Sequence, residues 1–182
     1  AYQREVESAI IRLAKATGGR QLALFTSYAQ LKRTAKAIEP AMADAGIEVF
    51  EQGEGASTNT LLETFRETEK AVLLGTRAFW EGVDIPGEAL SVLVIVKLPF
   101  DVPSDPIISA RAETFEDSFN EYNLPEAILR FRQGFGRLIR TQSDRGVVVI
   151  LDKRVLTKKY GRQFIDSLPL CTQKKASTVD LP

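Results

Sequence analysis

The sequence predicts an α/β fold with a doubly wound, mainly parallel sheet that has helices on both faces. Three uninterrupted apolar runs carry this prediction, at residues 71–76, 90–96 and 146–151. Such runs are typical of parallel strands buried on both faces, whereas half-exposed antiparallel strands alternate apolar with polar side chains. Helical patterns separate the runs, as the crossover connections between parallel strands require.

The expected elements follow one another along the chain in this alternating order. A helix is expected at residues 5–16, where Val6, Ile10 and Leu13 share one helical stripe and two glycines follow. The N-terminal half should add a strand at 21–25, a helix at 28–44, a short strand at 47–50 and a helix at 58–66. Pro40 predicts a kink or an early end in the second helix. Ligand sites of such sheets gather at the carboxyl ends of the strands, that is, directly after Phe25, Leu74, Val96 and Leu151.

Composition limits the class of protein and the kinds of site. The 182 residues are 44% hydrophobic, which suits one soluble globular domain, expected at 1–170 with a flexible tail at 171–182. Cys171 is the single cysteine, so a disulfide framework, a cysteine-ligated zinc or an iron–sulfur cluster cannot form within this chain. Histidine is absent, and no metal site is predicted. Without a signal-peptide stretch or a membrane span, a cytoplasmic location is expected.

The charged residues sum to zero but are unevenly distributed. Residues 39–69 are strongly acidic, whereas residues 130–162 carry ten basic side chains against Asp144 and Asp152. A basic run most often forms an ordinary solvated surface. Here it coincides with a sequence motif, which favours a site for a polyanion.

A helix expected at residues 125–140 carries the charges of most interest. Pro125 suits its first turn, and Arg130, Gln133, Arg137 and Arg140 form a cationic stripe opposite an apolar one. Two glycines inside the helix each cost about 1 kcal/mol relative to alanine, so another group should approach the backbone closely or the helix should begin late. A guanidinium on this stripe could bind phosphate oxygens through its planar fork.

Four segments resemble, in the same order, the signature motifs of the DinG/XPD branch of superfamily 2 helicases. Residues 133–140 have the sixth-motif pattern Q-x-x-G-R-x-x-R, and residues 74–87 contain the fifth-motif phrase FWEGVD followed by Pro-Gly. Residues 24–28 resemble the fourth motif, and residues 97–111 resemble the loop between the fifth and sixth motifs. The resemblance covers about residues 21–151 and implies the second RecA-like motor domain of a DNA helicase.

This resemblance implies a shared ATP site between two RecA-like domains. ATP with Mg²⁺ would bind mainly to the first domain, which this chain lacks, and an iron–sulfur cluster would belong to the parent protein only. Arg137 and Arg140 would be arginine fingers, positioned by Gln133. The other implied nucleotide-binding residues are Glu81, Gly82, Asp84 and Gly136, with Asp84 either bonding the ribose or holding an arginine finger. Walker A and B motifs are absent, so the fragment alone is expected to be inactive.

Single-stranded DNA and the first RecA-like domain are the implied partners, and no membrane contact is expected. Thr26, Ser27 and Tyr28 follow a strand end, where hydroxyls and backbone N–H groups can hold phosphates, and Thr76 and Arg77 are placed similarly. For Ser27 and Thr76, helix capping is nearly as strongly expected. Trp80, with Phe79, could stack on unpaired bases, although we favour a place in the core for at least one of them.

Two other classes of function stay open at this point. A binding or regulatory module could keep the fold without the motor, but it would have no need of Gln133, Arg137 and Arg140. An unrelated doubly wound small-molecule enzyme would require a glycine-rich phosphate loop after the first strand, where Thr26-Ser27-Tyr28 stands instead.

Overall fold

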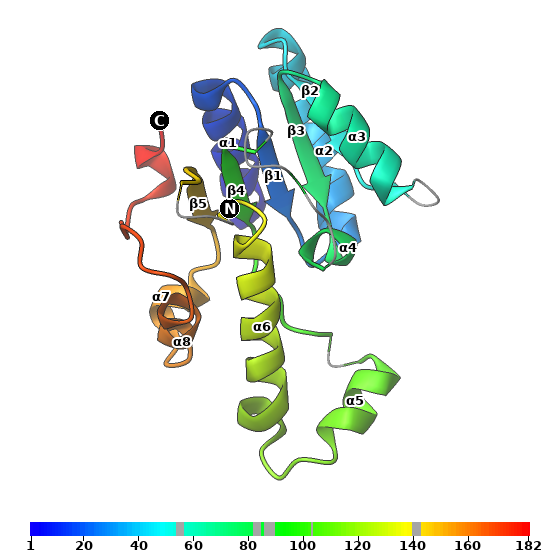
Figure 1. Ribbon diagram of the computed structural model, residues 1–182, viewed down its shortest axis with the longest axis vertical. Helices are drawn as coiled ribbons and strands as arrows, with labels where there is room; N and C mark the ends of the chain where they lie inside the picture. The colour runs from blue at the N-terminus through cyan, green and yellow to red at the C-terminus, as the bar shows by residue number, and fades with distance from the viewer. Residues whose placement is uncertain (54–56, 82–84, 86–89, 103, 140–142) are drawn as a thin grey trace.

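A five-stranded parallel sheet forms the centre of the chain (Figure 1). The computed structural model describes residues 1–53, 57–81, 85, 90–102, 104–139 and 143–182, with Arg77 described by its backbone alone. The strands are β1 (Gln21–Leu24), β2 (Glu48–Glu51), β3 (Ala71–Gly75), β4 (Val92–Ile95) and β5 (Val147–Ile150). Their order is β2-β3-β1-β4-β5 and every neighbouring pair is parallel, which confirms the predicted fold class.

The position of each strand in the sheet explains its sequence. The three inner strands β1, β3 and β4 are buried along their whole length, and apart from Gln21 in β1 their residues are apolar. The edge strands β2 and β5 are only partly covered, and Val147 at the start of β5 is 52% exposed. Leu24 pairs with Gly75 on one side and with Ile95 on the other, so β1, β3 and β4 end level with one another.

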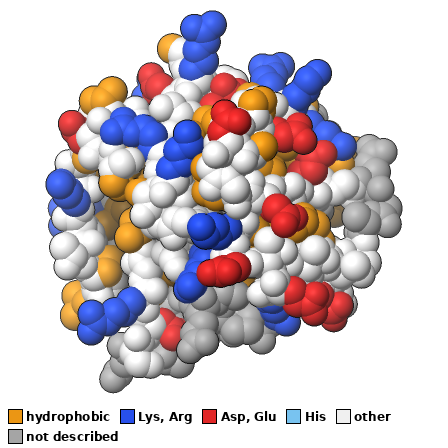
Figure 2. Space-filling view, turned by 90° about the horizontal axis from the view of Figure 1, so that it is seen from above, with side chains coloured by type: hydrophobic (Ala, Val, Ile, Leu, Met, Phe, Trp, Pro, Cys, Tyr) orange, Lys and Arg blue, Asp and Glu red, His pale blue; other side chains and the backbone are white. Residues whose placement is uncertain are grey.

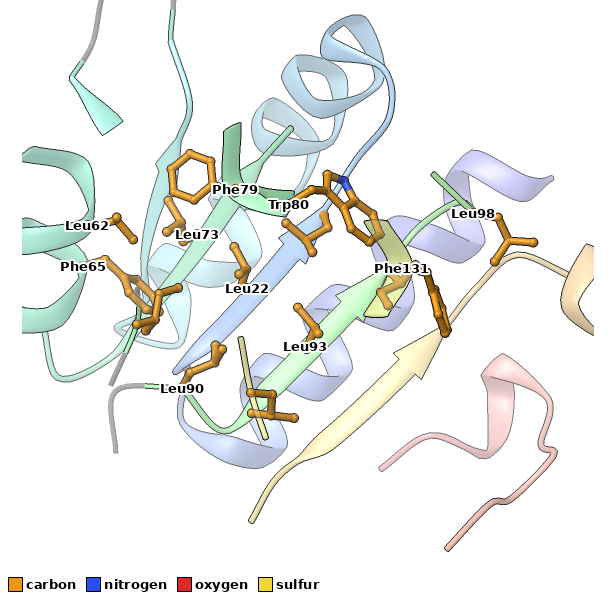
Figure 3. Close-up of a cluster of buried hydrophobic side chains, with 14 of the residues drawn as sticks. Leu22, Leu62, Phe65, Leu73, Phe79, Trp80, Leu90, Leu93, Leu98 and Phe131 are labelled. Carbon is orange, nitrogen blue, oxygen red and sulfur yellow. The ribbon is translucent and has the colours of Figure 1, made fainter. Parts of the chain in front are cut away.

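Helices cover both faces of the sheet. The helices α1 (Tyr2–Thr17) and α2 (Tyr28–Asp44) pack on one face and share a buried cluster with inward side chains of β1, β3 and β4. The helices α3 (Thr58–Glu67), α4 (Arg77–Trp80) and α6 (Leu124–Phe135) pack on the other face, around the cluster drawn in Figure 3. The sheet is therefore doubly wound.

One helix continues past an expected early end, and another ends earlier than predicted. The second helix has the predicted bounds, 28–44, and does not end early at Pro40, which is exposed while Ile38 and Met42 on either side hold the helix to the core. The helix predicted at 125–140 ends instead at Phe135, where Gly136 follows with its N–H bonded to the Arg132 carbonyl. Arg137 thus lies in a turn behind the helix rather than on it.

A helical arm extends beyond the carboxyl edge of the sheet. It consists of α5 (Pro106–Ala112), a short π-helix η2 (Phe119–Asn123) and the first turns of α6 (Figure 1). Sequence periodicity did not predict α5 or η2 because both are short. Asp105 caps α5 by accepting hydrogen bonds from the backbone N–H groups of Ile107 and Ile108.

The C-terminal segment contains α7 (Arg154–Thr157), α8 (Gly161–Asp166) and a 3-10 turn η3 (Thr178–Asp180). The turn lies against α1, where Arg12 donates hydrogen bonds to the carbonyls of Thr178, Val179 and Leu181. Ser177 and Asp180 form a capping box that closes the turn. Within the segment 171–182, which was expected to be a flexible tail, these backbone carbonyls thus bond to a helix of the domain.

Candidate functional site

A hollow of about 230 Å³ lies at the carboxyl edge of the sheet. Thr26 and Tyr28 line it from the end of β1, Thr76 and Trp80 line it from the end of β3, and the loop after β4 closes it. β1 leads to α2 on one face while β3 and β4 lead to helices on the other, so the hollow is at the topological switch point. Ligands of doubly wound sheets bind at such points. Four of the six residues predicted to contact DNA therefore surround one hollow.

The first turn of α2 lies at the rim of this hollow. Ser27 is its cap, because the Ser27 hydroxyl oxygen accepts a hydrogen bond from the Gln30 N–H at 3.3 Å. Thr26 is exposed, whereas Tyr28 is half-buried with the Lys32 ammonium 5.5 Å from the centre of its ring. The capping expected for Ser27 is thus confirmed, and it leaves the positive end of the helix dipole at the hollow.

Gln52 holds the start of α4 in place, and the sequence analysis missed it. Its side-chain oxygen accepts hydrogen bonds from the Thr76 N–H at 2.7 Å and from the Thr76 hydroxyl at 2.8 Å. Gln52 directly follows β2, so its position at the carboxyl end of a strand is the signal in the sequence that points to it. The backbone of Arg77 begins α4, and the Arg77 side chain lies outside the described residues.

Trp80 belongs to the core. Its side chain is 1% exposed, its indole N–H donates to the Phe25 carbonyl at 3.3 Å, and Phe79 beside it is also fully buried (Figure 3). A Cβ atom on Gly134 would lie 2.6 Å from two carbons of the Trp80 ring, so the indole packs directly on the backbone of α6. This burial fits the core place that we favoured for at least one of Phe79 and Trp80, and stacking of Trp80 on DNA bases stays a prediction. This packing also explains why position 134, the first of the two glycines in the predicted helix, has no side chain.

Gln133 lies in the last turn of α6, and Arg137 lies in the turn that follows the helix. Gln133 is exposed, and Arg137 is half-buried with one guanidinium nitrogen 3.4 Å from the Trp80 carbonyl oxygen. Burial lowers the pKa of Arg137, so an approaching anion would favour its charged form. Gly136 is the C-cap of α6. Arg140, Gly82 and Asp84, also predicted as site residues, lie outside the described residues.

Arg130 is buried, although periodicity placed it on the cationic stripe. Its guanidinium bonds to Glu81 at 3.1 Å, to Asp101 at 3.1 Å and to the Pro99 carbonyl at 2.8 Å. Loops after α4 and β4 cover this side of the helix, which periodicity alone could not foresee. Glu81, predicted to bind nucleotide, is therefore an ion-pair partner of Arg130 while its side chain stays 46% exposed.

Asp152 fixes the loop that follows β4. This buried carboxylate accepts a hydrogen bond from the Leu98 N–H at 2.9 Å and pairs with the Arg154 guanidinium at 2.6 Å. Burial opposes ionisation of Asp152, but the bonds from Arg154 and Leu98 outweigh it and lower its pKa. Asp152 directly follows Leu151 in the sequence, and the end of that strand is one of the places where functional residues were expected.

Neither the charges at the opposite edge of the sheet nor a group of metal ligands among the described residues adds to this site. Figure 2 views the molecule from the amino ends of the strands, and the coloured Lys, Arg, Asp and Glu side chains are interspersed there. Within the described residues, no three His, Cys, Asp or Glu side chains gather closely enough to hold a metal ion. The described part of the chain also has no helix long and apolar enough to cross a membrane.

Curated relatives match nearly the whole chain. The "3'-5' exonuclease DinG" of Bacillus subtilis (strain 168) is 41% identical over 174 residues, which are 93% of this chain and 19% of the relative. The "ATP-dependent DNA helicase YoaA" of Escherichia coli (strain K12) is 40% identical over 170 residues, covering 91% of this chain and 26% of the relative. The "ATP-dependent helicase DinG" of Mycobacterium tuberculosis (strain ATCC 25618 / H37Rv) is 41% identical over 165 residues, covering 88% and 24%. The chain thus spans about a quarter or less of each relative.

Solved structures and a family model agree with these relatives. Xpd4 of S. tokodaii superposes with a TM-score of 0.56 at 19% identity, over 92% of this chain and 34% of that one. Domain 2 of the DEAD-box helicase Mss116p, bound to an RNA duplex, gives 0.56 at 15% identity over 91% and 56%. These likenesses confirm the RecA-like fold. Because the model of the helicase C-terminal domain matches residues 10–171, the chain belongs to that family, in its DinG/XPD-like branch.

Proposed function

We propose that this chain is the second motor domain of an ATP-dependent DNA helicase. In this function Arg137 and Arg140, positioned by Gln133, supply arginine fingers to ATP that is bound mainly by a first RecA-like domain. Glu81, Gly82, Asp84 and Gly136 complete this side of the nucleotide site. Thr26, Ser27, Tyr28, Thr76 and Arg77 hold the phosphates of single-stranded DNA at the carboxyl edge.

One observation carries the proposal: a single helix joins the two proposed sites. Arg130 on α6 lines the hollow together with Thr26 and Thr76, and the end of the same helix presents Gln133 and Arg137. A motor domain needs such a connection, because nucleotide turnover has to be coupled to the strand. A regulatory module without turnover has no use for it.

Arg137 suits the chemistry of phosphoryl transfer. Its planar fork donates to phosphate oxygens and keeps its proton at neutral pH, so it can stabilise the negative charge that grows on the transferring group. Arginine fingers supply on the order of 10³ to 10⁵ in rate. The half-buried setting of Arg137 strengthens this effect, because water screens the charge less.

The test uses the parent protein. Single-strand-stimulated ATP hydrolysis is measured for wild type, Arg137→Ala and Arg140→Ala, with Arg132→Ala as the matched control, because Arg132 is exposed on the same helix. We expect kcat to fall by on the order of 10³ or more in the first two variants, while ATP and DNA affinity persist. Unchanged turnover in Arg137→Ala and Arg140→Ala would refute the proposal.

The proposal extends to properties of the parent. The isolated chain should not hydrolyse ATP, because the first domain would supply the phosphate loop and the Mg²⁺ ligands. An iron–sulfur cluster, if the parent has one, would be held outside this chain, and a cytoplasmic location stays a prediction. The Bacillus relative is named an exonuclease and the other two are named helicases, so strand unwinding has to be assayed separately from strand cleavage.

A further inference from the structure

Arg130 is a buried cation that lines the hollow, but it is assigned neither a DNA phosphate nor a step of ATP hydrolysis. It lies on α6 three residues before Gln133, and its residue surface is 8% exposed. A buried guanidinium requires compensation for each of its donor groups, since losing water costs several kcal/mol when they stay unpaired. Its compensation comes from two separate segments of the chain.

The first segment is the loop behind β4. Arg130 donates to the Pro99 carbonyl at 2.8 Å, and its Nη1 lies 3.1 Å from the Asp101 carboxylate, which is itself 8% exposed. Pro99 and Asp101 also line the hollow at the carboxyl edge. If a ligand in the hollow moves this loop, the bonds of Pro99 and Asp101 to the Arg130 guanidinium change with it.

The second segment is Trp80–Glu81, at the end of α4. Arg130 Nε bonds to Glu81 at 3.1 Å, and one turn further along α6 the Trp80 ring packs on Gly134. Beyond the helix end, Arg137 contacts the Trp80 carbonyl at 3.4 Å. Positions 130, 134 and 137 lie on one side of α6 and its following turn, so they hold this short segment at three points. Little freedom is left between the segment and the end of the helix.

We propose that Arg130 is a positioning residue that couples the hollow to Gln133 and Arg137. Single-stranded DNA bound in the hollow fixes the positions of Pro99 and Asp101. Because Arg130 bonds to both, it transmits a change in their positions to α6 and to Trp80–Glu81. Arginine suits this role because its planar fork reaches both segments at once, whereas lysine offers one compact charge. The inference rests on the proposed function, since it concerns the same turnover.

The experiment compares variants of the parent protein, with oligo(dT) as the strand. Arg130→Lys keeps the charge but loses the fork, and Arg130→Gln with Asp101→Asn removes both charges so that no carboxylate is left buried alone. Arg132→Gln, at an exposed position of the same helix, is the control. For each variant we measure kcat with and without oligo(dT), KM for ATP, oligo(dT) affinity and the thermal midpoint.

The expected result is a selective loss. The ratio of kcat with oligo(dT) to kcat without it falls by on the order of 10², the effect of misplacing a catalytic group by about 1 Å. KM and oligo(dT) affinity stay within about twofold of wild type, and Arg132→Gln behaves as wild type. A loss of this ratio in either Arg130 variant at an unchanged thermal midpoint supports the inference.

Two results overturn it. In the first, both Arg130 variants fold and keep the full stimulation by oligo(dT). In the second, the ratio, both affinities and the thermal midpoint decline together in both variants, as a purely structural residue would cause. Failure of the proposed function is distinct, because it appears in the wild type as absent stimulation or in Arg137→Ala as unchanged turnover.

Discussion

The replacement of Gly134 by alanine tests the packing at the centre of the site. An added Cβ would lie 2.6 Å from two ring carbons of Trp80 and 3.3 Å from a methyl carbon of Leu24. Trp80 cannot move away easily, because it is buried and its N–H is bonded to the Phe25 carbonyl. The substitution therefore forces either the indole or α6 to shift.

The expected size of the effect follows from two opposing contributions. Alanine gains about 1 kcal/mol over glycine in a helix, whereas overpacking a well-filled core costs about 1–3 kcal/mol. The clash with two ring carbons puts the cost at the upper end, so we expect a net loss of about 1–2 kcal/mol. For a chain of 182 residues this lowers Tm by about 2–8 °C.

Gly136 provides the matched control for this experiment. A Cβ there would lie 3.4 Å and 3.5 Å from two carbonyl oxygens, which is ordinary contact, and its φ of −64° suits alanine. Gly136→Ala should leave stability unchanged or raise it by up to about 1 kcal/mol. Urea and thermal unfolding of both variants, followed by circular dichroism, give the two values. Equal tolerance at both glycines, or a larger loss at Gly136, would show that the indole does not restrict α6.

Two further predictions concern the side chains that hold the loops of the site. Thr76→Val should lower stability by about 0.5–1.5 kcal/mol by removing the hydroxyl bond to Gln52, and Gln52→Ala combined with it should lose less than the sum of the single losses in urea unfolding. The lowered pKa of Asp152 means that its stabilisation is complete above the ordinary aspartate pKa of 3.8 and is lost as pH falls through the lower folded-state value. Asp152→Asn should therefore unfold with a weaker pH dependence below about pH 4, and an unchanged acid transition would contradict this.

The strands and long helices could be predicted because burial and capping leave local marks. β1, β3 and β4 are buried on both faces, and apart from Gln21 at the start of β1 their residues are all apolar. The bounds of α2 follow from Ser27 as its cap and from the buried stripe through Leu31, Ile38 and Met42. Fold class and most of the hollow then follow, since residues behind parallel strands meet at one edge.

The remainder depends on contacts between segments far apart in the sequence. Helical periodicity gives the direction of Arg130 but not the loops at Pro99 and Glu81 that cover it. Trp80 could have been a surface or a core residue, and the choice depends on whether Gly134 and Phe25 lie against it. The helices α5 and η2 are too short for a periodic signal.

The most direct test of the arginine-finger role is the single-turnover rate of ATP hydrolysis in the parent protein with Arg137→Ala, saturated with ATP and oligo(dT). We predict that this rate falls by on the order of 10³ to 10⁵ relative to the Arg132→Ala control, with both ligands still bound. A rate equal to that of the control would contradict the arginine-finger role, because Arg137 would then serve the packing of the domain, as in its contact with the Trp80 carbonyl.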